Sequence, residues 1–223
     1  MKKSILIISI MIISVVSANA QRGPLRGSGK LVFQSFEYTG FDKIDLSDLN
    51  GVIEIEVGQP YSIKVTIDDN LQNLFEVTNN SGKLKVGLRN NKNNSLYIED
   101  THIKIKISLP EISVLEHRGN STVKLSGIIG RYLRILNDGN GTITANGSID
   151  SFDLKNEGNG DILADNLLTK EAMVSKAGNG DITVNVSSKL QVKAAGNGDI
   201  INKGNADFQV TSKSGNGDLI KKN

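Results

Sequence analysis

The chain has 223 residues, with 26 Lys and Arg against 24 Asp and Glu, only 4 % aromatic residues and no cysteine. The absence of cysteine excludes disulfides, thiol catalysis, thiolate zinc sites, iron–sulfur clusters and a lipid-modified cysteine after a leader. The length suits one large domain or two small ones, and a hydrophobic fraction of 38 % is too high for a disordered chain.

The first twenty residues have the three parts of a secretory signal peptide. Two lysines precede an apolar run at 5–16, and the small residues at 18–20 predict cleavage between Ala20 and Gln21. The run is shorter than the ~20 apolar residues of a membrane span. We therefore expect an exported chain, periplasmic or extracellular, that is not a lipoprotein and does not insert into a membrane.

Cleavage would remove two of the 26 basic residues and none of the 24 acidic ones, which leaves a mature chain of zero formal charge. A neutral chain without a basic block argues against binding to nucleic acid or to an anionic membrane by charge alone.

After a predicted linker at 21–35, the segment 36–115 is rich in alternating apolar and polar residues. Such alternation is typical of strands with one buried and one exposed face. The stretch 70–75 predicts a single helical turn, and the Asn-rich stretch 90–94 predicts a loop. The clearest strands are expected at 53–57, 63–67, 83–86 and 103–107.

The segment 116–223 contains a repeat. Gly-Asn-Gly-Asp begins at positions 158, 178, 196 and 215, with looser copies at 139 and 119, so the leading glycines are 20, 19, 20, 18 and 19 residues apart. A period near 19 is too short for helical hairpins and fits the coil of a β-solenoid. We expect a corner at each copy, because glycine and asparagine accept positive φ. The predicted corner ladder comprises Gly139, Asn140, Gly158, Asn159, Gly178, Asn179, Gly196, Asn197, Gly215 and Asn216.

Apolar residues flank the corners with a period of two, which places them on one face of each strand. The residues after the corners are Ile143, Ile162, Ile182, Ile200 and Leu219. Those before them are Leu133, Ile135, Phe152, Leu154, Ala172, Val174, Leu190 and Val192. In the last repeat the pattern shifts by one residue, at Phe208 and Val210, which predicts a bulge. Stacked strands would lie ~4.8 Å apart.

Leu109-Pro110-Glu111-Ile112 leads into this repeat, and Ser187-Ser188-Lys189-Leu190 precedes its third full copy. With the signal peptide and the glycine corners, these segments resemble the putative auto-transporter adhesin family with a head "GIN" domain, over about residue 36 to the C-terminus. The resemblance implies an all-β, right-handed parallel β-helix with ~19-residue coils, exported by bacteria with an envelope, and no catalytic residues. The predicted domain is 36–223, non-repetitive over 36–115 and repetitive over 116–223.

The aspartates of the repeat, Asp161, Asp181, Asp199 and Asp218, would form one column, in which like charges ~4 Å apart repel each other. A Ca²⁺ site or a catalytic cluster is one interpretation. However, lysines occur two or three residues before the same glycines, and they are missing where the aspartate is missing. We therefore favour a structural ladder in which each aspartate pairs with a lysine or caps a backbone N–H. These lysines are Lys155, Lys176, Lys193 and Lys213.

No cofactor site is evident, and His117 beside Glu116 is expected to be a solvated surface residue. We expect a non-enzymatic, adhesin-like binding protein whose partner is a surface, a glycan or another protein. The sequence leaves its ligand and oligomeric state open. The alternatives are a polysaccharide-active enzyme on the same fold, which would need free carboxylates, and a structural module for envelope assembly.

Overall fold

The computed structural model describes residues 24–89 and 98–222, so the predicted signal peptide, its cleavage site at Ala20 and Gln21 and the loop at 90–94 lie outside the described residues. The protein is all-β, with a long sheet of 15 strands. The strands before residue 110 are β1 (Leu25–Arg26), β2 (Leu31–Phe36), β3 (Lys43–Leu49), β4 (Gly51–Val57), β5 (Ser62–Asp68), β6 (Phe75–Asn80), β7 (Lys83–Leu88), β8 (Ile98–Glu99) and β9 (Ile103–Leu109). Those after it are β10 (Val114–Gly119), β11 (Thr122–Asn137), β12 (Ile143–Asn156), β13 (Ile162–Lys176), β14 (Ile182–Ala194), β15 (Ile200–Asn202), β16 (Phe208–Lys213) and β17 (Leu219–Lys221).

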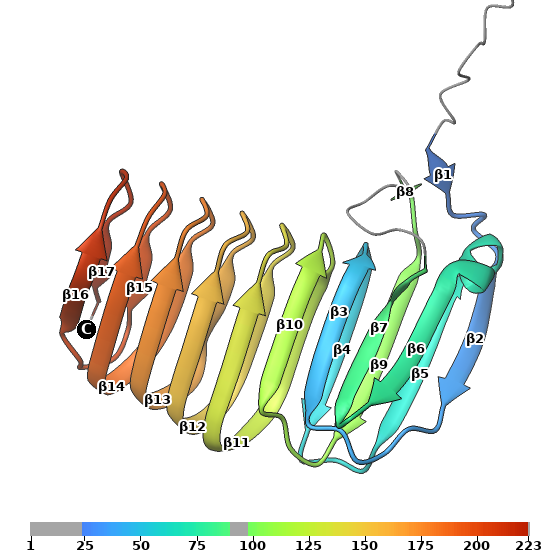
Figure 1. Ribbon diagram of the computed structural model, residues 1–223, viewed down its shortest axis with the longest axis horizontal. Helices are drawn as coiled ribbons and strands as arrows, with labels where there is room; N and C mark the ends of the chain where they lie inside the picture. Colours follow the sequence, from blue (N-terminus) through green and yellow to red (C-terminus); the bar gives the residue numbers. More distant parts are fainter. Residues whose placement is uncertain (1–23, 90–97, 223) are drawn as a thin grey trace, which may run out of the picture.

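The strands form two layers, stacked along the longest dimension of the molecule with the N-terminal strands at one end (Figure 1). In the first layer the order is β2, β5, β9, β4, the N-terminal parts of β11 to β14, then β15 and β17. In the second layer it is β6, β7, β3, β10, the C-terminal parts of β11 to β14, then β16. Strands β11 to β14 are long enough to belong to both layers.

From β11 onward every strand pairs in parallel with a strand one repeat later in sequence, up to the last repeat. Ile143 is opposite Ile162, which is opposite Ile182, and Ile182 is opposite Ile200. Antiparallel pairs occur only near the N-terminal end of the described sheet, between β2 and β5, β5 and β9, and β6 and β7. The bulge predicted in the last repeat is confirmed, since the pairing of β14 with β16 shifts after Val192.

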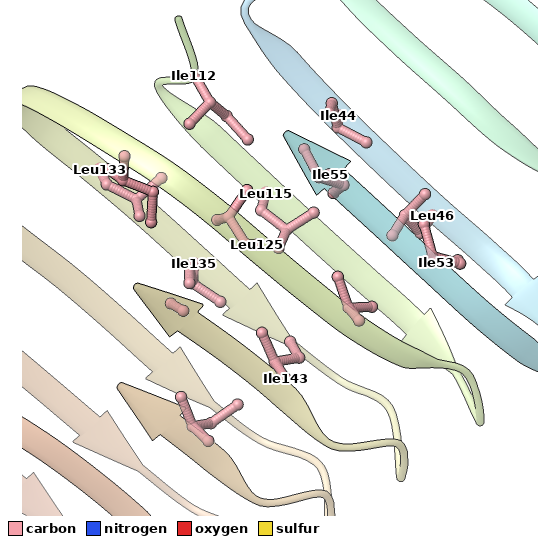
Figure 2. Packing of buried hydrophobic residues seen from close by; sticks show 14 of the residues in the cluster. Ile44, Leu46, Ile53, Ile55, Ile112, Leu115, Leu125, Leu133, Ile135 and Ile143 are labelled. Atoms are coloured by element: carbon pink, nitrogen blue, oxygen red, sulfur yellow. The ribbon is translucent and has the colours of Figure 1, made fainter. Parts of the chain in front are cut away.

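The core lies between the two layers, where branched aliphatic side chains point toward one another (Figure 2). The predicted inward face is confirmed, because Ile162, Ile182 and Ile200 are at most 1 % exposed. The apolar residues before the corners, from Leu133 to Val192, are buried as well. At ~25 cal/mol per Å² of buried apolar surface, this continuous core is the main source of stability.

The predicted linker at 21–35 is wrong over most of its described part. It contains β1 and most of β2, and β2 pairs with β5 over six residues. Val32, Gln34 and Phe36 are half-buried there, so the alternation of this short strand is real but weaker than that of its neighbours. The predicted turn at 70–75 is confirmed as a 3₁₀ helix at Asp69–Leu74. No helix in the described segments is long and apolar enough to span a bilayer.

Candidate functional site

The glycine corners stack directly on one another. A Cβ added to Gly158 would overlap the carbonyl oxygen of Gly139, and one on Gly178 would overlap that of Gly158. Among the five predicted corner glycines, only Gly196 and Gly215 have positive φ, at 103° and 90°. The explanation by positive φ is therefore wrong for the other three, where glycine is required because the backbones of successive repeats approach so closely.

The corner asparagines form a ladder of side-chain hydrogen bonds. Asn159 Nδ2 donates to Asn140 Oδ1 at 3.2 Å, and Asn179 Nδ2 donates to Asn159 Oδ1 at 2.9 Å. Asn197 continues the ladder onto Asn179 at 2.9 Å, and Asn216 onto Asn197 at 3.4 Å. Each amide thus uses its donor and its acceptor on neighbouring repeats, as in other stacked asparagine ladders.

The aspartates of the repeat form a second ladder beside the first. The backbone N–H of Asp181 donates to Asp161 Oδ1 at 2.8 Å, and the same contact links Asp199 to Asp181 and Asp218 to Asp199. Each of these acceptor carboxylates therefore binds the N–H of the next repeat. Within the described residues no group of three or more His, Cys, Asp or Glu side chains is arranged to hold a metal ion.

The predicted pairing of lysines with these aspartates is wrong. Lys155 Nζ instead forms an ion pair with Glu157 at 2.7 Å, and Lys176 donates to the carbonyl oxygen of Gly198. Among the described residues, no ion pair joins Lys155, Lys176, Lys193 or Lys213 to the aspartate ladder.

Strand register explains this error. Lys155 and Lys193 are both opposite Ser175, in a column that points outward. Lys176 instead follows Asn156 in the neighbouring inward column and is only 2 % exposed. Lys155 and Lys193 lie three residues before their glycine, whereas Lys176 lies two residues before its own. Because successive residues of a strand alternate between the two faces, Lys176 lies on the opposite face from the other two. Burial lowers the pKa of Lys176, although the nearby carboxylates raise it.

The inward column beneath the corners is polar. His117 is 1 % exposed, with Nδ1 2.7 Å from Asn137 Oδ1 and Nε2 2.9 Å from Ser121 Oγ. Asn137 Nδ2 in turn donates to Asn156 Oδ1 at 2.9 Å. The expectation of a solvated His117 is therefore wrong. Burial and Arg118 lower its pKa, whereas the Asn137 contact raises it, and the net shift is downward.

The Ser121–His117–Asn137 chain has the connectivity of a hydroxyl nucleophile, a base and an orienting group. However, Ser121 and Asn137 are 0 % exposed. A substrate could not reach the hydroxyl without opening the corner. The chain therefore satisfies buried polar groups at the start of the repeat stack.

A cleft of about 520 Å³ lies on the outer surface of the first layer, across β2, β5, β9, β4 and β11. Its charged side chains come from the outward-facing positions of these adjacent strands. We call it the lysine cleft, and we define it by Phe33, Glu54, Lys64, Lys104, Lys106 and Lys124.

The lysine cleft has more positive than negative charge. Lys106 Nζ pairs with Glu56 Oε1 at 2.7 Å, beside the cleft. In the part of the chain that the structure describes, no carboxylate lies within ion-pair distance of Lys64, Lys104 or Lys124. These three lysines are exposed and available to an anionic group.

Phe33 forms the apolar wall of the lysine cleft. It is 80 % exposed, although it is paired with Thr66 within the sheet. The exposed ring thus gives the cleft an apolar side next to the ammonium groups of its lysines.

The model of the family described as "Putative auto-transporter adhesin, head GIN domain" matches residues 40–206. The chain belongs to this family. The match includes β3 to β15 and thus all the lysines of the cleft, whereas Phe33 precedes it.

Two solved structures share the fold of this GIN-domain protein. A putative adhesin from Bacteroides fragilis has a TM-score of 0.69 and 22 % identity, over 89 % of this chain and 100 % of that one. A putative lipid binding protein from Parabacteroides distasonis has a TM-score of 0.54 and 20 % identity, over 90 % of this chain and 100 % of that one. A comparison with curated proteins finds no match.

Sequence reasoning missed the lysine cleft of the GIN domain. Its signal is present, because lysines occupy the polar positions of the alternating segments 63–67 and 103–107. The sequence does not show the order in which the strands pair. In the structure β9 lies between β4 and β5, although about forty residues separate β5 from β9 in sequence.

Proposed function

We propose that this GIN-domain protein is an exported, non-enzymatic binding protein of the adhesin type, built on a right-handed parallel β-helix with ~19-residue coils. The parallel pairing of β11 to β17 and the stacked corners support that architecture. The family match supports export and an adhesin-like role.

The observation that carries the proposal is the lysine cleft. Three exposed lysines that form no ion pair among the described residues, together with an exposed phenylalanine, line one open surface, which also includes Glu54. Such a surface can bind an anionic group by charge and an adjoining apolar or sugar face by contact with Phe33. Strands hold all these side chains, so the surface is formed before binding and little ordering is required.

The hydrogen bonds of the repeat aspartates and the burial of the Ser121–His117 pair favour a non-enzymatic role over that of a polysaccharide-active enzyme. The repeat aspartates that could act as general acids or bases accept backbone N–H groups. The Ser121–His117 pair is buried. Release of reducing sugars from a polysaccharide by the purified protein would overturn this part of the proposal.

The experiment is a glycan array with neutral and acidic members, probed with the mature protein. Lys104→Glu combined with Lys124→Glu reverses two unpaired charges of the lysine cleft. A matched control, Lys189→Glu combined with Lys193→Glu, reverses the same number of lysine charges, but on the second layer. We expect binding to acidic members that the first variant loses and the control keeps. Equal binding by all three proteins, or none, would contradict the proposal.

A second candidate is binding of an anionic lipid, favoured by the exposed Phe33 next to the lysines and in keeping with the name of one structural neighbour. Flotation with phosphatidylglycerol vesicles, against phosphatidylcholine vesicles as the control, separates the two candidates. The variant Phe33→Ser should weaken lipid binding more than Lys124→Glu does if the apolar contact dominates.

A further inference from the structure

Two outward columns run along the whole first layer. One passes from Lys104 of β9 through Val52 and Thr122 to the ladder of Asp161, Asp181, Asp199 and Asp218. The other passes from Lys64 and Lys106 through Glu54 and Lys124 to Thr144 of β12. It then continues through Leu163, Thr183, Ile201 and Ile220.

The charges on these two columns are segregated along the molecule. The strands of the N-terminal end contribute four lysines and one glutamate, whereas β13 to β17 and the corners before them contribute four aspartates and no cation. The mature chain has no net formal charge if the first twenty residues are removed. These two columns therefore carry opposite charges at opposite ends of a neutral molecule.

The aspartates form no ion pair among the described residues, although the buried Lys176 ammonium lies near Asp181 and Asp199. Each of Asp161, Asp181 and Asp199 uses Oδ1 for one backbone N–H, and none is in an ion pair among the described residues. Between Lys124 of β11 and Asp161 at the start of β13, only β12 intervenes, and its outward Thr144 is uncharged; beside the aspartates, Leu163 of β13 is 38 % exposed. These two columns thus have a basic end and an acidic end, separated by the single strand β12.

We propose that a second copy of this chain binds to this face. A two-fold axis parallel to the strands would reverse the long axis of one copy relative to the other, so that each lysine cleft faces the aspartate ladder of its partner. Such an interface uses the same patch twice and closes as a dimer. Both charged contacts are attractive, and β12 of each copy would lie between them.

This inference rests on the proposed function, because it names the partner of the lysine cleft. It makes the adhesin homophilic: copies displayed on two surfaces would join them. The other partner considered for the lysine cleft, an acidic glycan, would bind the same lysines. The two partners are distinguishable, because self-association needs the aspartate ladder and glycan binding does not.

The experiment is analytical ultracentrifugation of the mature protein at low and high salt. We expect a dimer whose dissociation constant rises at least tenfold when NaCl increases from about 50 to about 500 mM, because the contact is between exposed charges. Lys104→Glu with Lys124→Glu should be monomeric, and Lys189→Glu with Lys193→Glu should behave as wild type. A wild-type protein that is monomeric at low salt, or a dimer that both variants leave intact, would overturn the inference.

A charge exchange gives the sharper test. Asp181→Lys with Asp199→Lys should also be monomeric, yet an equimolar mixture with the Lys→Glu variant should form a heterodimer, since both contacts become attractive again. If the Asp→Lys variant does not fold, Asp181→Asn with Asp199→Asn keeps both backbone contacts and should still raise the dissociation constant at least tenfold. Glycan binding lost in the Lys→Glu variant but retained by these aspartate variants, without any dimer, would sustain the proposed function and refute homophilic binding.

Discussion

His117 Nδ1 lies 2.7 Å from Asn137 Oδ1, one repeat later in the chain, and both side chains are buried. Asn137 Oδ1 also accepts the N–H of Gly139, and its Nδ2 donates to Asn156. The asparagine oxygen is therefore the acceptor, which assigns the proton of the neutral imidazole to Nδ1 and leaves Nε2 to accept the hydroxyl of Ser121. A polar column thus begins at a histidine and continues through asparagines beneath the corners.

This column predicts a pH dependence of stability. The pKa of His117 is lowered from 6.5 in the folded chain, chiefly because burial disfavours the imidazolium. Below about pH 6.5 the unfolded chain therefore binds more protons than the folded chain. The contribution of the neutral His117 to stability is lost as the pH falls from about 6.5 through the lower pKa of the folded chain. The variant His117→Asn should lose this dependence. Urea unfolding between pH 4 and 8 measures it, and identical pH profiles for the two proteins would contradict the assignment.

The inward isoleucines should be sensitive to truncation. Ile182→Ala should lower the free energy of unfolding by about 2–4 kcal/mol, because it leaves a cavity between two stacked repeats. Ile201→Ala, on the outward side of the neighbouring strand, is the matched control and should cost less. Chemical denaturation of both variants gives the comparison, and an equal loss would show that the inward face is misassigned.

The corner glycines should resist substitution for a steric reason. Gly178→Ala would force a methyl group against the carbonyl of Gly158 and should cost about 1–3 kcal/mol or more. Gly130→Ala is the control, because nothing lies within 4 Å of the added carbon and its φ is not positive. Melting temperatures distinguish the two, and a similar effect at both sites would argue for a purely entropic role of glycine.

The aspartate ladder should tolerate loss of charge better than loss of its oxygen. Asp181→Asn keeps an acceptor for the N–H of Asp199 and should change stability by less than about 0.5 kcal/mol, whereas Asp181→Ala should cost about 1 kcal/mol. Neither Ca²⁺ nor a chelator should shift the melting temperature of the wild type. A rise of several degrees with Ca²⁺ would instead show a metal site at the corner.

Much of the fold was predictable because the same pattern of apolar residues and glycines recurs in successive copies of the repeat. The inward isoleucines from Ile143 to Ile200 and the corner positions follow from alternation and a period near 19 residues. Strand β2 was missed, because it is short and one of its outward residues is Phe33, so its apolar pattern does not identify one buried face.

By itself, the sequence determined the strands of the repeat, their inward face and the position of each corner, because these depend on local periodicity. Only the tertiary structure decided which columns adjoin, because register depends on pairing between strands distant in sequence. A difference of one residue places Lys176 in the interior and Lys193 on the surface. The insertion of β9 between β4 and β5 likewise brings Lys64, Lys106 and Lys124 onto one surface, which no local pattern reveals.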